Sequence, residues 1–304
     1  MPSGNSLKPS RMKELENYIR ISKNIVREAY RQFNADDMRL VWSGHKDSTL
    51  TLWIWKKACA EYGLKMPKVV TINEGDQFAE VDEFLQRISR EWGLVLEVVE
   101  NSDLLKACNY SIGAVVSVND LNQHNREEIK RIGFKTLEKF PFQTNSFICH
   151  HLLKSVALNN YIAENNVKVI IQGFRWDEKP AKSNAPYFEK LNLKHLQHEL
   201  IGIYPILHIT ERALWDIYHH WGLPYVSLYQ EGYRSLGAKS ATVKISDVPA
   251  WKQDLENTGE RAGRSIYGAS LSRTANNLKT EVKNAKQEQD FEDEVTRRLH
   301  MLGY

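Results

Sequence analysis

The 304-residue sequence predicts an α/β fold built on a doubly wound, mainly parallel sheet. Short β-prone runs alternate along the chain with segments of helical periodicity, and this alternation is typical of a parallel sheet with helices on both faces. Hydrophobic residues make up 42% of the chain, which is enough for a substantial core. The net charge is only +3, with no basic stripe along the sequence, so charge alone identifies no partner.

Apolar spacing and turn residues place each element. Thr210 is expected to cap the last predicted helix, because its hydroxyl can accept an orphan backbone N–H there, while Glu211 complements the helix dipole. The expected elements are helix 12–33, strand 38–42, helix 49–62, strand 68–72, helix 78–92, strand 94–99, helix 147–165, strand 167–171, strand 202–207 and helix 211–221.

Composition divides the chain into three parts. We expect a loose N-terminus over residues 1–10, a nucleotide-binding domain over 11–225 and a C-terminal helical and loop extension over 226–304. The extension carries arginine-rich motifs and ends in a charged tail, expected to be a solvated helix or partly disordered. Within the domain, 101–146 is expected to be an insertion with one short helix near 126–138, and 176–194 a mobile loop.

The sequence contains neither a secretory leader nor a run of ~20 apolar residues, so we expect a cytoplasmic protein without a membrane span. Cys59, Cys108 and Cys149 each stand alone, which argues against disulfides and zinc motifs. The run Cys149-His150-His151 is open to two interpretations. It is either a sulfur carrier or metal ligand, or a buried or capping cysteine at the start of a helix.

The polar loop that follows strand 38–42 has the composition of a phosphate-binding loop. Ser43 and Ser48 offer hydroxyl groups, Gly44 allows close approach of backbone N–H groups, and Lys46 brings a positive charge to a helix N-terminus. In a doubly wound sheet, ligands bind at the carboxyl ends of the strands, where this loop is expected to lie. The loop does not follow the Walker pattern, which excludes the usual GTPase interpretation.

The loop Ser43-Gly44-His45-Lys46-Asp47-Ser48 resembles the Ser-Gly-Gly-Lys-Asp-Ser loop of the PP-loop ATP pyrophosphatases, the Rossmann-like adenine nucleotide α-hydrolase group. Further segments resemble, in order, the phosphoadenylyl-sulfate (PAPS) reductase family and its sulfate adenylyltransferase small-subunit branch. These segments are Ile72-Asn73-Glu74-Gly75, Gly173-Phe174-Arg175-Trp176-Asp177-Glu178, Tyr204-Pro205-Ile206, Gly232-Tyr233-Arg234-Ser235-Leu236-Gly237 and Glu260-Arg261-Ala262-Gly263-Arg264.

The resemblance implies an ATP site with Lys46 and Arg175 as the catalytic residues. Lys46 would stabilise the departing pyrophosphate, and Arg175 would reach the α-phosphate or the sulfur substrate, unless it forms a plain surface salt bridge. Asp47 would either help to hold Mg²⁺ or cap the helix. The implied nucleotide-binding residues are Ser43, Gly44, His45, Lys46, Asp47, Ser48, Asn73, Gly75, Gly173, Arg234, Arg261 and Arg264.

Some of these residues also have structural interpretations. Asn73 and Gly75 suit either an adenosine subsite or an ordinary strand-to-helix turn. At least one of Arg234, Arg261 and Arg264 is expected to be structural, and Glu260 and Arg261 are open to pairing with each other.

The function implied by the resemblance is cleavage of ATP between the α and β phosphates in sulfur metabolism. Sulfate adenylation with a GTPase-type partner subunit is the first expectation. His45 replaces the second glycine of the family's loop, although that branch also varies there, and Ala238 stands where a cysteine is common. Trp176 stands where the branch usually has a second arginine, and this altered segment keeps nucleic-acid sulfur modification within a larger complex open. A PAPS reductase-type member and a non-catalytic nucleotide-binding subunit are the remaining alternatives.

Overall fold

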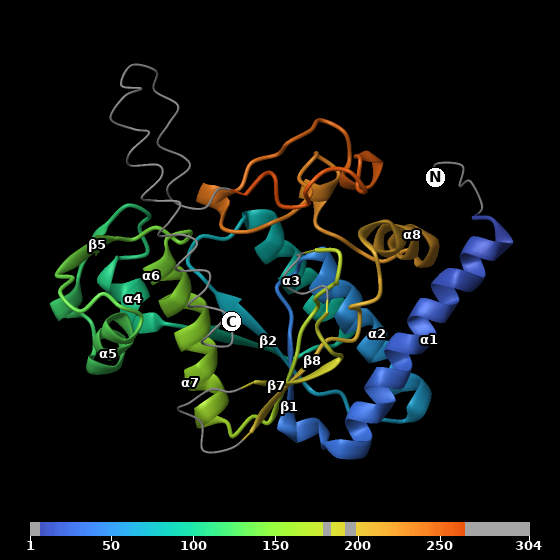
Figure 1. Ribbon diagram of the computed structural model, residues 1–304, viewed down its shortest axis with the longest axis horizontal. Coiled ribbons are helices and arrows are strands. Elements are labelled where there is room, and N and C mark those ends of the chain that lie inside the picture. The colour runs from blue at the N-terminus through green and yellow to red at the C-terminus, as the bar shows by residue number, and fades with distance from the viewer. Residues whose placement is uncertain (1–6, 179–183, 192–198, 265–304) are drawn as a thin grey trace.

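The main sheet of the protein is doubly wound, as the sequence predicts. The computed structural model describes residues 7–178, 184–191 and 199–264 (Figure 1). Among these residues, the main sheet has the strand order β3-β2-β1-β6-β8-β7. Neighbouring strands are parallel except for β7, which is antiparallel to β8.

The elements keep the order expected from the sequence. The helices are α1 (Pro9–Gln32), α2 (Lys46–Tyr62), α3 (Ala79–Trp92), α4 (Ser102–Ala107), α5 (Gln123–Arg131), α6 (Phe147–His150), α7 (Ala157–Glu164) and α8 (Glu211–Trp221). The strands are β1 (Met38–Val41), β2 (Lys68–Asn73), β3 (Leu96–Glu100), β4 (Val115–Ser117), β5 (Lys139–Pro141), β6 (Val169–Ile171), β7 (Phe188–Leu191) and β8 (Leu200–Ile203).

Helices cover both faces of the main sheet. One hydrophobic cluster joins α1, α2, α3 and α8 to the sheet, and α7 packs on the other face (Figure 1). The strand β1 lies between these layers. Met38 and Leu40 enter the first cluster, while Val41 packs with residues of the α7 face, as the two-residue period of a strand requires.

Arg39 is a buried charge on the α7 face of β1, and its partners are all supplied by the fold. Its Nε donates to the hydroxyl of Tyr161 at 2.9 Å, and its Nη1 donates to the carbonyl oxygens of Asp36 and Met38. The Tyr161 hydroxyl in turn donates to Glu97 on β3. This chain of hydrogen bonds ties α7 to two strands of the sheet.

The strand order reverses between β1 and β6. From β1 the chain runs outward through β2 and β3, and it then returns to the other side of β1 as β6. The loops that follow β1 and β6 therefore leave the sheet from neighbouring carboxyl ends. This is the place where doubly wound proteins have their ligand-binding crevice. The loop of residues 43–45 and the segment 172–178 lie at this point.

Residues 101–146 contain more structure than the sequence predicts. They form a small unit of α4, α5 and the antiparallel pair β4–β5, with its own hydrophobic cluster (Figure 1). The expected helix near 126–138 is α5, but it begins and ends earlier, because Asn122 caps it and Gly133 follows with a φ of 107°. The short strands were missed because three residues carry little periodicity.

Two further expectations change. The helix α1 already begins at Pro9, so the expected loose N-terminus is wrong for residues 9 and 10. Part of the expected loop 176–194 is the edge strand β7, while residues 179–183 and 192–194 lie outside the described residues. The charged tail also lies outside them. None of the described helices is long and apolar enough to cross a membrane.

We expect Tyr161→Phe to lower the free energy of unfolding by about 1–2 kcal/mol, because the buried Arg39 and the Glu97 carboxylate each lose a hydrogen-bond partner. Urea unfolding monitored by circular dichroism measures the change. The exposed Tyr110→Phe serves as the control and should leave stability within about 0.5 kcal/mol of wild type. Equal stability of both variants would show that the network contributes nothing.

Candidate functional site

The loop between β1 and α2 folds around the side chain of Ser48. The Ser48 hydroxyl accepts from the backbone N–H of Ser43 at 3.2 Å and donates to the carbonyl oxygen of His45 at 3.0 Å. The Ser43 hydroxyl lies 3.1 Å from the Ser48 hydroxyl oxygen. Gly44 has a φ of 75°, a conformation that favours glycine, and a Cβ there would lie 3.1 Å from Val81. The loop therefore needs its serines and its glycine to close.

The N-terminus of α2 opens onto this loop with unused donors. His45 occupies the cap position without a side-chain cap. Within the described part of the chain, no hydrogen bond engages the backbone N–H groups of Gly44, His45, Asp47 or Ser48. Free N–H groups at a helix N-terminus, aligned with the helix dipole, are suited to an anion.

Two tyrosines hold the first turn of α2 in place. Tyr229 accepts from the Lys46 N–H at 3.1 Å, and Tyr218 on α8 donates to the Lys46 carbonyl oxygen at 2.6 Å. Both phenols are buried. Burial raises the pKa of each, so both hydroxyls stay protonated. The sequence assigns no contact with the loop to either tyrosine, because the fold brings them there from more than 170 positions away.

Gly173, in the segment after β6, packs directly on the start of α2. A Cβ at this position would lie 2.6 Å from the carbonyl oxygen of Asp47 and 2.8 Å from the backbone nitrogen of Ser48. The sequence predicts Gly173 as a nucleotide-binding residue. In the structure its lack of a side chain lets the two loops of the crevice meet.

Lys46 and Arg175 lie in one buried ion network. Both donate to the carboxylate of Glu260, and Arg175 also donates to Asp47 and, at 2.9 Å, to Asp177. Arg175 is completely buried, so the surface salt bridge considered from the sequence is wrong. Burial lowers the pKa of the Arg175 guanidinium, but Glu260 and Asp177 outweigh that effect and raise it, so it stays charged.

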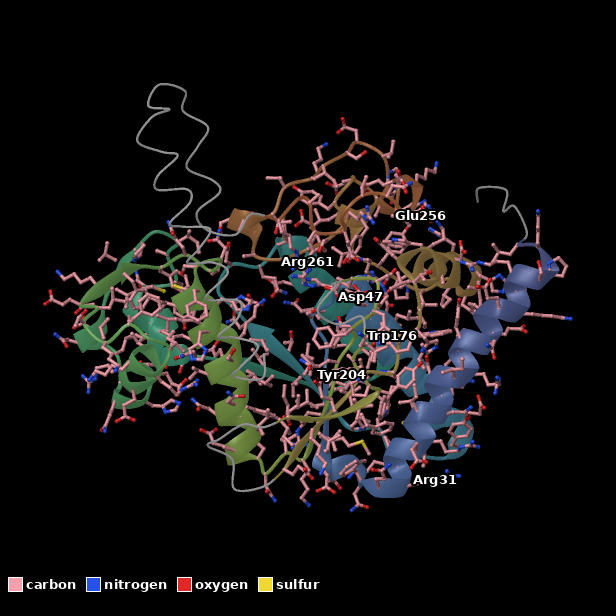
Figure 2. All side chains as sticks on the ribbon, in the orientation of Figure 1. Arg31, Asp47, Trp176, Tyr204, Glu256 and Arg261 are labelled. Atoms are coloured by element: carbon pink, nitrogen blue, oxygen red, sulfur yellow. The ribbon has the colours of Figure 1, made fainter. Side chains whose placement is uncertain are left out.

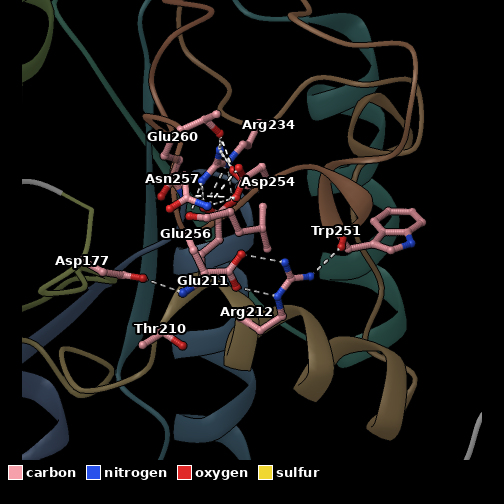
Figure 3. Close-up of polar contacts among 12 residues, drawn as sticks. Asp177, Thr210, Glu211, Arg212, Arg234, Trp251, Asp254, Glu256, Asn257 and Glu260 are labelled. Carbon is pink, nitrogen blue, oxygen red and sulfur yellow. Dashed lines mark hydrogen bonds and ion pairs between the residues drawn. The ribbon is translucent and has the colours of Figure 1, made fainter.

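Arg234 forms the adjoining part of the network (Figure 3). Its guanidinium makes a fork with Glu211, the first residue of α8, at 2.8 to 3.2 Å. The remaining donors bond the carbonyl oxygens of Asp254 and Leu255 and the hydroxyl of Thr258. Every donor of Arg234 is thus used within the protein, and this is the structural arginine that the sequence leads us to expect.

His45 and Arg264 lie among several cationic side chains. Burial and the nearby Arg264, Lys154 and Lys46 hold the pKa of His45 well below its ordinary value. Burial, with Arg261 as the next cause, lowers the pKa of Arg264 to about 10. The Nε of Arg264 has no acceptor among the described residues. The His45 imidazole is therefore neutral, and the positive charge left without a partner beside the loop is that of Arg264.

Arg261 belongs to the same segment but has a partner. It donates to Glu178 at 2.7 Å, and its side chain remains 39% exposed. The pairing of Glu260 with Arg261 considered from the sequence is therefore wrong, because Glu260 pairs with Lys46 and Arg175 while Arg261 pairs with Glu178. Figure 2 shows Arg261 above Asp47 and Trp176, over the carboxyl end of the sheet.

Asn73 and Gly75 lie at the end of β2 and make a turn. The Asn73 side chain accepts from the Gly75 N–H at 3.0 Å and donates to Glu100 at 2.8 Å. Gly75 has a φ of 73°, and a Cβ there would lie 2.7 Å from Leu105. The next residue, Asp76, which the sequence did not single out, accepts from Thr144 at 2.7 Å and from the Ser240 hydroxyl.

Asp47 is not arranged as a magnesium ligand. One carboxylate oxygen bonds Arg175, and the other lies 3.5 Å from the Lys46 ammonium. In the described ranges there is also no cluster of three or more His, Cys, Asp and Glu side chains that could hold a metal ion. Both oxygens of Asp47 contact cationic side chains of the protein, so the residues as placed do not fit Mg²⁺.

The three cysteines are buried. Burial raises the pKa of each thiol, so none is poised as a thiolate. Cys149 lies in the helix start capped by Ser146, whose hydroxyl accepts the Cys149 N–H at 3.3 Å. Of the two interpretations of this run, the buried cysteine at a helix start matches the geometry.

The doubly wound sheet, the loop 43–48 at its switch point and the crevice formed with residues 172–178 define an α/β protein of the adenine nucleotide α-hydrolase-like class. The chain belongs to the phosphoadenosine phosphosulfate reductase domain family, whose model matches residues 37–244. The match includes the loop 43–48, the segment 172–178 and Arg234.

Curated relatives of the chain include adenosine 5'-phosphosulfate reductases. The protein from Bacillus anthracis is 21% identical over an alignment of 183 residues that covers 48% of this chain and 78% of the relative. The protein from Geobacillus sp. is 24% identical, with 75% of its length covered.

Solved structures with a similar fold include two fungal enzymes. The FMN adenylyltransferase of Candida glabrata has a TM-score of 0.60 at 16% identity and covers 86% of this chain and 91% of its own. The PAPS reductase of Candida auris, solved as a phosphate complex, has a TM-score of 0.50 at 15% identity and covers 79% and 100%. At these identities the likeness concerns the fold alone.

We expect Gly173→Ala to lower the free energy of unfolding by about 1–3 kcal/mol, because the added methyl group would overlap the backbone of Asp47 and Ser48. Thermal and urea unfolding measure the loss. Gly259→Ala is the matched control, since its Cβ would meet no atom within 4 Å. Unchanged stability of Gly173→Ala would contradict the close packing of the two loops.

The folded protein should react slowly with the thiol reagent DTNB at pH 8, because its cysteines are buried and their pKa values are raised. In denaturant all three should react at the rate of free cysteine. Release of thionitrobenzoate, followed at 412 nm in the spectrometer, measures both phases. A fast stoichiometric reaction in the native protein would identify an activated thiol and favour reductase chemistry.

Proposed function

We propose that this protein binds ATP at the loop 43–48 and transfers its adenylyl group to an acceptor, releasing pyrophosphate. The acceptor belongs to sulfur metabolism, and sulfate is our first choice. This proposal keeps the function that the sequence motifs imply and assigns each part of the site a role.

The observation that carries the proposal is the uncapped N-terminus of α2 at the switch point of the sheet. Its free N–H groups and the unpartnered positive charge of Arg264 beside the loop suit a polyphosphate. A bound anion beside His45 and Arg264 would offset the repulsion that lowers their pKa values. The same loop in a phosphate-free protein would have no comparable reason to leave these donors unpaired.

The reaction needs no covalent intermediate on the protein. An oxygen of the acceptor attacks the α-phosphorus, the bond from this phosphorus to the bridging oxygen breaks, and pyrophosphate leaves with the electron pair. Catalysis then depends on holding the phosphates in line and on stabilising the charge of the leaving group. Backbone N–H groups and fixed cations supply both without moving.

Adenylyl transfer is favoured over reduction by the state of the cysteines. Reduction of an adenylated sulfate needs an electron donor, and a thiolate is the donor that this chain could offer. All three of its cysteines are buried with raised pKa values. The fungal FMN adenylyltransferase shows that a related fold serves adenylyl transfer in at least one protein.

The acceptor and the partner remain open to experiment. Sulfate with a GTPase-type partner subunit is one arrangement, and a complex that modifies nucleic acid with sulfur is another. FMN is a third acceptor, suggested by the fungal adenylyltransferase. A non-catalytic subunit would bind ATP without turnover.

Pyrophosphate release from ATP in magnesium buffer tests the proposal, using the wild-type protein with sulfate, FMN, nucleic acid or no acceptor. We expect release that one acceptor stimulates at least tenfold. Lys46→Ala should abolish it, because Lys46 lies in the first turn of α2 and holds the ion network there.

Lys57→Ala is the control, since Lys57 lies on the exposed face of the same helix and contacts only the Trp53 ring at 4.8 Å among the described residues. It should retain wild-type release. ATP binding without release under every condition would identify a nucleotide-binding subunit, and absence of ATP binding would overturn the proposal.

A further inference from the structure

Glu260 occupies a central position between the loop and the C-terminal segment. Its two oxygens receive the Lys46 ammonium and one amino group of Arg175. The Glu260 side chain is only 6% exposed and that of Lys46 only 2%. Burial raises the pKa of Glu260, but Lys46 and Arg175 outweigh it and hold the pKa far below its ordinary value, so the carboxylate stays charged.

Lys46 is directed into the protein. Besides Glu260, its ammonium bonds the carbonyl oxygen of Arg234 at 3.1 Å and lies 3.5 Å from Asp47 and 3.9 Å from Glu211. An ammonium group has three donors, of which Glu260 and the Arg234 carbonyl oxygen accept two, and the carboxylates of Asp47 and Glu211 lie near the third. In this arrangement Lys46 is therefore held by acceptors of the protein itself.

The charges of the network point the same way. Lys46, Arg175 and Arg234 are its cations, and the carboxylates that they contact are Asp47, Asp177, Glu211 and Glu260. Carboxylates outnumber cations here, so the network as a whole does not attract a triphosphate. The positive charge without a partner carboxylate is instead that of Arg264, whose Nε has no acceptor among the described residues.

Arg261 and Arg264 follow Glu260 by one and four positions. The segment that carries them contains no helix or strand beyond short turns, and tertiary contacts fix its place. These contacts are the ion pairs of Glu260, the bond from Arg261 to Glu178, and the bridge between Thr242 and Arg264. Glu260 is the contact that joins this segment directly to the first turn of α2.

We propose that Glu260 is a positioning residue. Together with Lys46 it forms a buried clamp that holds the segment with Arg261 and Arg264 against the phosphate-binding loop. Lys46 then acts through Glu260, and the charge that meets the nucleotide comes from Arg264 and Arg261. This inference rests on the proposed function, in which the loop binds the phosphates of ATP.

The rival arrangement makes Lys46 a phosphate ligand that exchanges Glu260 for ATP. The two arrangements differ in what an apolar replacement of the pair would do. Removing one partner of a buried pair leaves an unpaired charge, whereas replacing both with apolar residues of similar size is often neutral. A clamp tolerates that replacement, but a phosphate ligand does not.

The test compares Lys46→Met, Glu260→Leu and the double variant with wild type. ATP affinity is measured by calorimetry, and stability is measured by thermal unfolding. We expect each single variant to lose at least tenfold in ATP affinity and to unfold at a lower temperature. The double variant should recover both, with an affinity within about threefold of wild type, because the apolar pair again joins the segment to α2 and Arg175 keeps Asp47 and Asp177 as partners.

Two further variants complete the experiment. Arg264→Met should weaken ATP binding at least tenfold without lowering the unfolding temperature, since its guanidinium has an unpartnered Nε in the described structure. Glu256 lies on the same segment as Glu260 and forms an exposed ion pair with Arg212 of α8 (Figure 3). Glu256→Gln should change neither the ATP affinity nor the unfolding temperature. If the single variants fail to fold, the double variant and Arg264→Met still decide the question.

A double variant that recovers its stability but not its ATP affinity would overturn the inference and make Lys46 a phosphate ligand. Wild-type affinity in Arg264→Met would also contradict it. Failure of the wild-type protein itself to bind ATP would instead overturn the proposed function. The outcomes therefore separate the two proposals.

Discussion

The site depends on a buried ion network that joins five separate stretches of the chain. Lys46 and Asp47 come from the start of α2, Arg175 from the segment after β6, Glu211 from the start of α8, Arg234 from the segment 232–237, and Glu260 from the C-terminal segment. Buried charges are tolerated only when each is paired, so no part of this network can move alone. The network fixes the loop and the crevice relative to each other.

The sheet provides the frame for this arrangement. Because strand order reverses between β1 and β6, their loops meet at one edge, and Gly173 allows them to touch. Tyr218 and Tyr229 hold the first turn of α2 from the other side. The helix start is thereby preorganised, with its N–H groups directed at the crevice and few ways to relax. Preorganised donors of this kind are suited to stabilising charge on phosphate oxygens.

Membership of a reductase domain family leaves the chemistry of this chain open. Relatives by sequence are adenosine 5'-phosphosulfate reductases, while the fold also matches an FMN adenylyltransferase. What separates these reactions is the group that meets the sulfur or phosphorus atom. Here the thiols are buried, and the positive charge lies beside the loop, which favours attack on phosphorus over transfer of electrons to sulfur.

The sequence by itself determined the order of strands and helices, the capped start of α8 and the phosphate-loop motif, because these depend on local periodicity and on residues close together in the chain. It missed β4, β5 and β7, whose three or four residues become strands only by pairing. Tertiary structure alone decided the partners of the charges. Glu260 met Lys46 rather than its neighbour Arg261, since burial selects pairs across 214 positions that sequence spacing cannot show.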